Sequence, residues 1–111
     1  MIDVEIKEKL KEGILIFDGA MGTMLQSSGL KLGELPEILN ITDSKIIIEI
    51  HKAYIEAGAN VITTNTFGAN EIKLKNSNFS VEKIIHSAVE NAKIATKNKQ
   101  AYIALDIGPI G

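Results

Sequence analysis

Three short polar segments hold the residues whose types and spacing could support ligand binding or chemistry: residues 18–23, 65–70 and 106–111. Each segment combines glycine with carboxylate, amide or hydroxyl side chains. Glycine lets backbone N–H groups come close to a ligand, and helix N-termini favour its anionic end. Asp18 and Asp106 would direct two carboxylates into a shared space, which suits an ammonium group or a metal ion.

The same residue types also have a structural explanation. Aspartate and glycine are common in turns and helix caps, so each segment taken alone favours a structural role. Three such segments, each following a predicted strand, make a binding site an equal alternative. His51 and His86 are lone histidines on predicted helices and are interpreted as structural or solvent-facing. Met21 and Met24 are interpreted as flexible packing residues.

Composition excludes several classes of function. The chain has 111 residues, which is one domain or part of a larger one, and its net charge is -2. All 12 basic residues are lysine, so the balance of charge gives no basic surface for nucleic acid. Cysteine is absent, which excludes disulfides and thiolate chemistry within these residues. No apolar run approaches the roughly 20 residues of a membrane span, and no secretory signal is present, so we expect a cytoplasmic protein.

Alternating strands and helices must position the three polar segments. Short apolar runs predict strands at residues 14–17, 61–64 and 101–107, the first of them buried on both faces. Helical periodicity predicts helices at residues 3–12, 42–57 and 80–98, with a short helix inside residues 18–36. Thr42 or Asp43 is a candidate N-cap, Gly58 a candidate helix end, and Ser80 the cap of the last helix. This order favours an α/β fold with a parallel sheet and crossover helices.

The predicted sheet is small for a complete domain. Three parallel strands leave two edges open, although parallel sheets normally have both faces covered. Residues 1–111 are therefore interpreted as a truncated domain.

Several motifs, taken together and in order, resemble the homocysteine S-methyltransferase domain, in the form found in cobalamin-dependent methionine synthases. They are FDGAMGTMLQ at 17–26, LPE at 35–37 with LNI at 39–41, HKAYIEAGAN at 51–60, TTNTFGAN at 63–70 and DIGP at 106–109. The resemblance implies that the chain is the N-terminal portion of a (β/α)8 TIM barrel, with about three parallel strands and crossover helices. A complete barrel needs about 250 residues, so this barrel would be incomplete.

The resemblance also implies a reaction. Members of the family are transferases of one-carbon metabolism and methionine biosynthesis, in which zinc held by three cysteine thiolates activates the homocysteine thiol. That thiolate takes a methyl group from methylcobalamin, itself recharged from methyltetrahydrofolate, and the product is methionine. A zinc ion can hold sulfur as thiolate at neutral pH, where a free thiol is mostly protonated.

Motif position implies roles for individual residues. Asp18 would accept a hydrogen bond from the substrate ammonium group, and the backbone N–H groups of Ala20 and Met21 would hold its carboxylate. Side chains from all three segments would line or brace the pocket. The substrate-binding set implied is Asp18, Gly19, Ala20, Met21, Gly22, Thr23, Asn65, Thr66 and Asp106.

The segment departs from the family where catalysis is concerned. The family's zinc ligands lie in later strands, so we expect no catalytic or metal-binding residue here and no activity from these residues alone. The full enzyme would require the remainder of the barrel and the folate and cobalamin domains as partners. Two alternatives stay open: a non-catalytic module that binds an amino acid through Asp18, and an oligomeric remnant that pairs its open edges with other copies.

Overall fold

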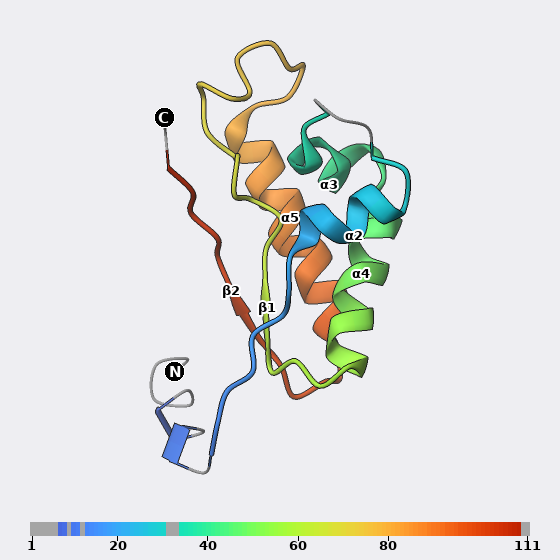
Figure 1. Cartoon of the computed structure of the whole chain (residues 1–111). Helices are drawn as coiled ribbons and strands as arrows, with labels where there is room; N and C mark the ends of the chain where they lie inside the picture. Colours follow the sequence, from blue (N-terminus) through green and yellow to red (C-terminus); the bar gives the residue numbers. More distant parts are fainter. Residues whose placement is uncertain (1–6, 9, 12, 31–33, 110–111) are drawn as a thin grey trace.

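The computed structural model describes residues 7, 8, 10, 11, 13–30 and 34–109 (Figure 1). The helix predicted at 3–12 lies largely outside these residues, as do positions 110 and 111 of the third polar segment. In chain order the elements are α2 (Met21–Ser27), the 3-10 helix η1 (Pro36–Ile38), α3 (Leu39–Thr42), α4 (Ser44–Glu56), β1 (Val61–Thr63), α5 (Val81–Thr96) and β2 (Tyr102–Ala104). Among the helices described, none has the length and apolar character needed to cross a bilayer.

Strands β1 and β2 pair in parallel, and helix α5 connects them. Val61 lies opposite Tyr102, and the register continues to Thr63 opposite Ala104. Val61 and Ile62 are buried, and both have the branched Cβ that favours strands. The predicted strand–helix–strand unit is thus confirmed, although β2 ends at Ala104 and not at residue 107 as predicted. Both strands end at the same edge of the sheet.

The first predicted strand, at residues 14–17, forms only one bridge, between Phe17 and Val61. Backbone hydrogen bonds from Asp18 N–H to the Val61 carbonyl (2.9 Å) and from Val61 N–H to the Ile16 carbonyl (3.1 Å) align it parallel to β1. The ladder stops there because the Ile16 N–H donates to the Asn60 side chain instead (3.0 Å). The prediction of burial on both faces is wrong in this structure, because Phe17 is 57% exposed and no described segment covers its outer side.

Helix α4 begins two residues later than predicted because Asp43 separates it from α3. The Asp43 backbone is not helical (φ -148°, ψ 60°), its N–H donates to the Leu39 carbonyl, and its side chain makes no capping hydrogen bond within the described structure. The predicted C-terminus is confirmed at Gly58. Its positive φ of 111° is a conformation that glycine adopts without strain, and its N–H donates to the Ile55 carbonyl.

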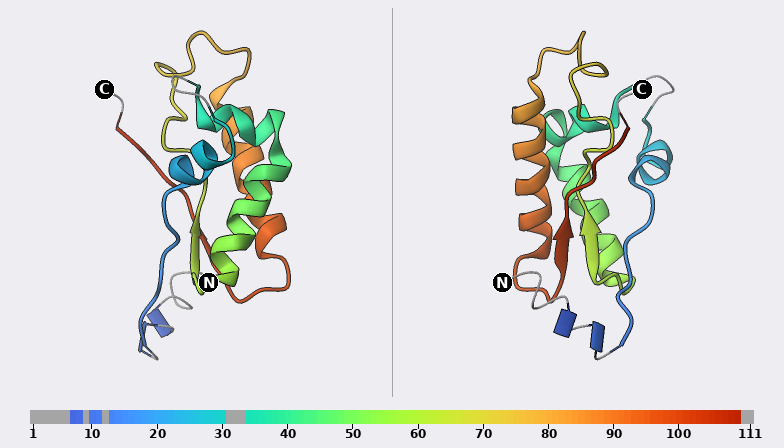
Figure 2. Two further views of the ribbon diagram at one scale, coloured as in Figure 1. Left: turned by 45° about the vertical axis from the view of Figure 1, so that its right-hand side comes forward. Right: turned by 90° about the vertical axis from the view of Figure 1, so that its left-hand side faces the viewer.

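Helix α5 begins at the predicted cap, where the Ser80 hydroxyl oxygen accepts a hydrogen bond from the Lys83 N–H (3.1 Å). Its buried face carries small residues, Ala88, Ala92 and Ala95, which allow close packing. Helices α4 and α5 pack against each other on one side of the two strands (Figure 2). They therefore form the covering layer, and the strand ends remain accessible above it.

Candidate functional site

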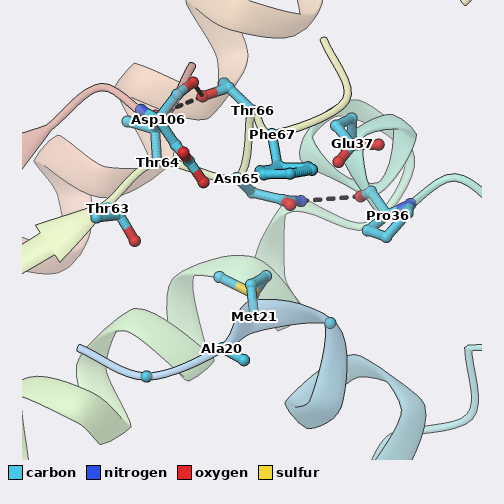
Figure 3. Close-up of a pocket in the computed structure, with 12 residues that line it drawn as sticks. Ala20, Met21, Pro36, Glu37, Thr63, Thr64, Asn65, Thr66, Phe67 and Asp106 are labelled. Atoms are coloured by element: carbon cyan, nitrogen blue, oxygen red, sulfur yellow. Dashed lines mark hydrogen bonds between the residues drawn. The ribbon is translucent and has the colours of Figure 1, made fainter. Parts of the chain in front are cut away.

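A cavity of about 470 Å³ opens where β1 and β2 end, beside the first turn of α2 (Figure 3). This volume falls in the range of small-molecule sites, roughly 300–1,000 Å³. Ligands of parallel α/β folds bind at the carboxyl ends of strands, so the position is the expected one. Four stretches of chain contribute the lining residues, which are Gly19, Ala20, Met21, Gly22, Pro36, Glu37, Thr63, Thr64, Asn65, Thr66, Phe67 and Asp106.

The Asp18 carboxylate is held by Thr63, the last residue of β1, which lines this cavity. The Thr63 hydroxyl donates to Asp18 Oδ1 at 2.9 Å. The Thr63 backbone N–H donates to both carboxylate oxygens, each at 3.2 Å. One residue of the neighbouring strand thus fixes the orientation of the carboxylate.

The surroundings of the Asp18 side chain disfavour its charged form. Burial raises the pKa of Asp18 above its ordinary value of 3.8, the hydrogen bonds from Thr63 oppose this, and the negative charge of Asp106 adds to it. The net direction is upward. A cation placed beside Asp18 would replace the lost hydration and favour the ionised form.

The first glycine of the site, Gly19, allows the Tyr54 side chain of helix α4 to approach the backbone closely. A Cβ atom on Gly19 would lie 2.8 Å from Tyr54 Oη and 3.0 Å from the Tyr54 ring. The Tyr54 hydroxyl donates to the Ala20 carbonyl at 3.0 Å. This contact holds the turn between residues 18 and 21 against α4, and the backbone of Ala20 and Met21 then lines the cavity.

A chain of hydroxyl hydrogen bonds joins the ends of β1 and β2. The Thr66 hydroxyl donates to the Asp106 carbonyl (2.6 Å) and lies 2.7 Å from the Thr64 hydroxyl oxygen. Because Thr66 uses its proton on Asp106, Thr64 must donate to Thr66, and the Thr64 oxygen in turn accepts from the Asp106 N–H (3.1 Å). Both hydroxyls are buried and occupied, so they brace the loop that carries Asp106.

An amide and carboxylate cluster holds the segment that follows β1. The Asn65 side chain donates to the Pro36 carbonyl (2.8 Å), and the Asn40 side chain donates to the Asn65 carbonyl (2.7 Å). Glu37, only 5% exposed, accepts from the Gly68 N–H at 3.1 Å. A Cβ on Gly68 would lie 2.9 Å from Glu37 Oε1, so a larger residue there would displace the Glu37 carboxylate. The cluster fixes η1 against the loop and completes one wall of the cavity.

The structure brings together most of the residues that the sequence singled out. Seven of the nine line the cavity: Gly19, Ala20, Met21, Gly22, Asn65, Thr66 and Asp106. Asp18 contacts the lining residue Thr63, and Thr23 is exposed on α2 outside the lining set. Their roles toward a ligand stay predictions.

Sequence reasoning assigned no site role to five lining residues: Pro36, Glu37, Thr63, Thr64 and Phe67. Thr63 and Thr64 could have been identified from the sequence. They end a predicted strand, so they lie at the same sheet edge as the residues that follow. For Pro36 and Glu37 no strand precedes them, so periodicity gave no such signal.

The residues described do not fit a zinc centre. The chain has no cysteine, and the described part contains no group of three or more His, Cys, Asp or Glu side chains arranged to hold a metal ion. His51 is fully buried, and burial lowers its pKa from 6.5 to about 4. His86 is exposed on α5. Both positions agree with the interpretation of these histidines as structural or solvent-facing.

Comparison with known sequences gives consistent matches. A family model described as homocysteine S-methyltransferase matches residues 15–111. The chain is 42% identical over 74 residues to a methionine synthase of Mycobacterium leprae, and 40% identical over 76 residues to a methionine synthase of Mycobacterium tuberculosis. These matches cover 61% and 63% of this chain but 6% of each relative, so the chain spans a small part of their length.

Comparison with solved structures supports the same fold. The homocysteine methyltransferase MmuM of Escherichia coli matches in its oxidized form with a TM-score of 0.76 and 25% identity, covering 86% of this chain and 37% of that one. Its metallated form matches with a TM-score of 0.84 and 22% identity, covering 96% of this chain and 42% of that one. The arrangement of β1, β2 and their helices is therefore that of part of a larger α/β fold.

Proposed function

Since the chain belongs to the homocysteine S-methyltransferase family, we propose that its cavity recognises the amino-acid moiety of homocysteine in a methyltransferase that forms methionine. The observation that carries this proposal is the convergence of three distant segments on one cavity of suitable size, at the carboxyl ends of the strands. The residues that converge are those at 19–22, 65–66 and 106.

The geometry suits both charged groups of an amino acid. Asp18 would accept a hydrogen bond from the ammonium group, because its partly buried carboxylate is oriented by Thr63 and lacks a nearby cation in the described structure. The backbone N–H groups of Ala20 and Met21 would hold the carboxylate. The Met21 side chain points across the cavity toward Asn65, where it would contact the aliphatic part of the substrate (Figure 3).

Activation of the substrate thiol is not assigned to any residue of this chain. Zinc would supply the thiolate at neutral pH, but residues 1–111 have no cysteine, so any thiolate ligands must come from other residues. We propose methylcobalamin, recharged from methyltetrahydrofolate, as the methyl donor. What supports this choice over other donors is the identity of about 40% to two methionine synthases.

Apolar side chains are exposed near the strand ends, which supports the proposal that further barrel strands cover them. Phe17 is 57% exposed, Leu105 51% and Ile107 82%, although all three flank the parallel strands. In the relatives of known structure, the part that corresponds to this chain is 37% to 42% of the whole. We propose that the remaining strands of the barrel cover these side chains. We also propose that the full enzyme has folate and cobalamin domains.

Replacing Asp18 by Asn tests the function directly. In the naturally encoded protein, Asp18→Asn should weaken homocysteine binding about 10- to 100-fold, because a charge-assisted hydrogen bond contributes about 1.5–3 kcal/mol. Calorimetry measures this change in affinity. Zinc content should not change. Asp43→Asn is the matched control, since Asp43 is exposed at the start of α4, and it should bind homocysteine normally. Unchanged affinity in Asp18→Asn would contradict the proposed function.

A further inference from the structure

Thr63 makes three separate contacts with the Asp18 carboxylate. Its hydroxyl donates to Oδ1 at 2.9 Å, and its backbone N–H is shared between Oδ1 and Oδ2 at 3.2 Å each. The hydroxyl contact is the shortest of the three. Thr63 is half-buried and itself lines the cavity, so this contact lies at the ligand side of the sheet edge.

The other titratable groups near Asp18 do not take over this role. Asp106, from the segment after β2, is negative and opposes ionisation of Asp18. Tyr54, from α4, donates its hydroxyl to the Ala20 carbonyl. Within the described structure, the Thr63 hydroxyl is therefore the side-chain donor that supports the charged form of this carboxylate.

Resting on the proposed function, we propose that Thr63 is a positioning residue that orients the Asp18 carboxylate and keeps it ionised. It thereby sets the lower pH limit of binding to the ammonium group of homocysteine. A substitution at position 63 keeps the backbone N–H donor, whereas the hydroxyl donor depends on the side chain. The branched Cβ of threonine restricts χ1, which holds the donor in place.

The Thr63 hydroxyl should affect how homocysteine affinity falls at low pH. Hydrogen bonds from Thr63 lower the pKa of Asp18 against the effect of burial. When the hydroxyl is removed, the pKa of Asp18 rises further and protonation begins at a higher pH. A protonated carboxyl group attracts the ammonium group much less, so affinity should fall at a higher pH than in the wild type.

The test is homocysteine affinity as a function of pH in the naturally encoded protein. Thr63→Val keeps the side-chain shape without the hydroxyl, and it should raise the pH midpoint of the acid limb by about one unit, which weakens binding about 10-fold at pH values below the wild-type midpoint. Thr63→Ser restores the donor and should bind within about twofold of wild type. Thr96→Val is the matched control, because the Thr96 hydroxyl bonds only to the Ala92 and Lys93 carbonyls of α5 in the described structure.

A double-mutant cycle separates this inference from the proposed function. In the Asp18→Asn background, Thr63→Val should cause no further loss of affinity, because the charge that it supports is gone. If Asp18→Asn weakens binding but Thr63→Val leaves both affinity and pH midpoint unchanged, the role of Thr63 is overturned and the proposed function stands. If Asp18→Asn has no effect, the proposed function itself fails.

A purely structural role for Thr63 would give a different result. Affinity would then fall equally at all pH values, with no shift of the midpoint, and that result overturns the proposal. Thr63→Ala serves as a second hydroxyl-free variant if Thr63→Val does not fold. If neither variant folds while Thr63→Ser does, the hydroxyl is needed for folding and the proposal is also overturned.

Discussion

Among single residues, His51 stands out because it is an ionisable side chain of α4 that is fully buried. It is 0% exposed, and neither ring nitrogen has a hydrogen-bond partner within the described structure. Burial disfavours the imidazolium form and lowers the pKa from 6.5 to about 4. The unfolded chain therefore binds a proton more readily than the folded one between these values. Stability should be highest above pH 6.5 and should fall as the pH drops through this window.

Replacing His51 by Leu should remove this acid sensitivity. Between pH 7 and pH 4.5 the histidine lowers the free energy of unfolding by about 2 kcal/mol, and His51→Leu should lose that component while keeping or gaining stability at pH 7. Urea unfolding at the two pH values measures both effects. His86→Leu, at an exposed position on α5, is the control and should keep the wild-type pH dependence. Equal acid sensitivity in His51→Leu and wild type would contradict the assignment.

Between elements, the buried residue Asn40 links η1, the loop after β1 and helix α5. Asn40, at α3, donates to carbonyls of Glu37 and Asn65, and its own carbonyl accepts from the Asn91 side chain of α5 at 3.0 Å. Asn40 and Asn91 are 1% and 4% exposed. The wall of the cavity formed by η1 is thus tied to the covering helix α5 through buried amides.

Loss of the Asn91 amide should leave the Asn40 carbonyl without this partner. We expect Asn91→Ala to lower the free energy of unfolding by about 1–3 kcal/mol, the cost of an unsatisfied buried polar group. Asn76→Ala, at an exposed loop position, should change it by less than about 0.5 kcal/mol. Thermal or urea unfolding of both variants measures the difference. A loss no larger in Asn91→Ala than in Asn76→Ala would show that the amide link contributes nothing.

The sequence predicted elements well where the signal is local. Ser80 caps α5 and Gly58 ends α4, because a cap depends on residues within one turn. Asp43 has the right side chain but makes no cap, because the chain enters α4 from α3 and the carboxylate is not placed over the first turn. The first strand was overpredicted because strand pairing depends on distant partners, and the Asn60 side chain takes the hydrogen bond of Ile16.

The site was predictable for the residues that directly follow strands. Residues 65, 66 and 106 reach the cavity because parallel strands end at one edge. Glu37 and Pro36 could not be found in this way, since their approach depends on contacts of Asn40 and Asn65 across the chain. Strand order alone did not reveal these contacts.

For the whole molecule, the main feature is that one side of the sheet is covered and the strand ends are open. Ile62 of β1 is 0% exposed, whereas Ile107, beyond the end of β2, is 82% exposed. A layer of helices on parallel strands is the arrangement of an α/β barrel wall. We therefore propose that this chain is the part of the fold that recognises the amino acid, and that other residues supply the chemistry at the thiol.

The most direct test of this account is a structure of the naturally encoded protein with bound homocysteine. We expect the ammonium nitrogen within about 3.2 Å of an Asp18 carboxylate oxygen, with the substrate carboxylate on the backbone N–H groups of Ala20 and Met21. Homocysteine bound away from this cavity, or bound with its carboxylate toward Asp18, would contradict it.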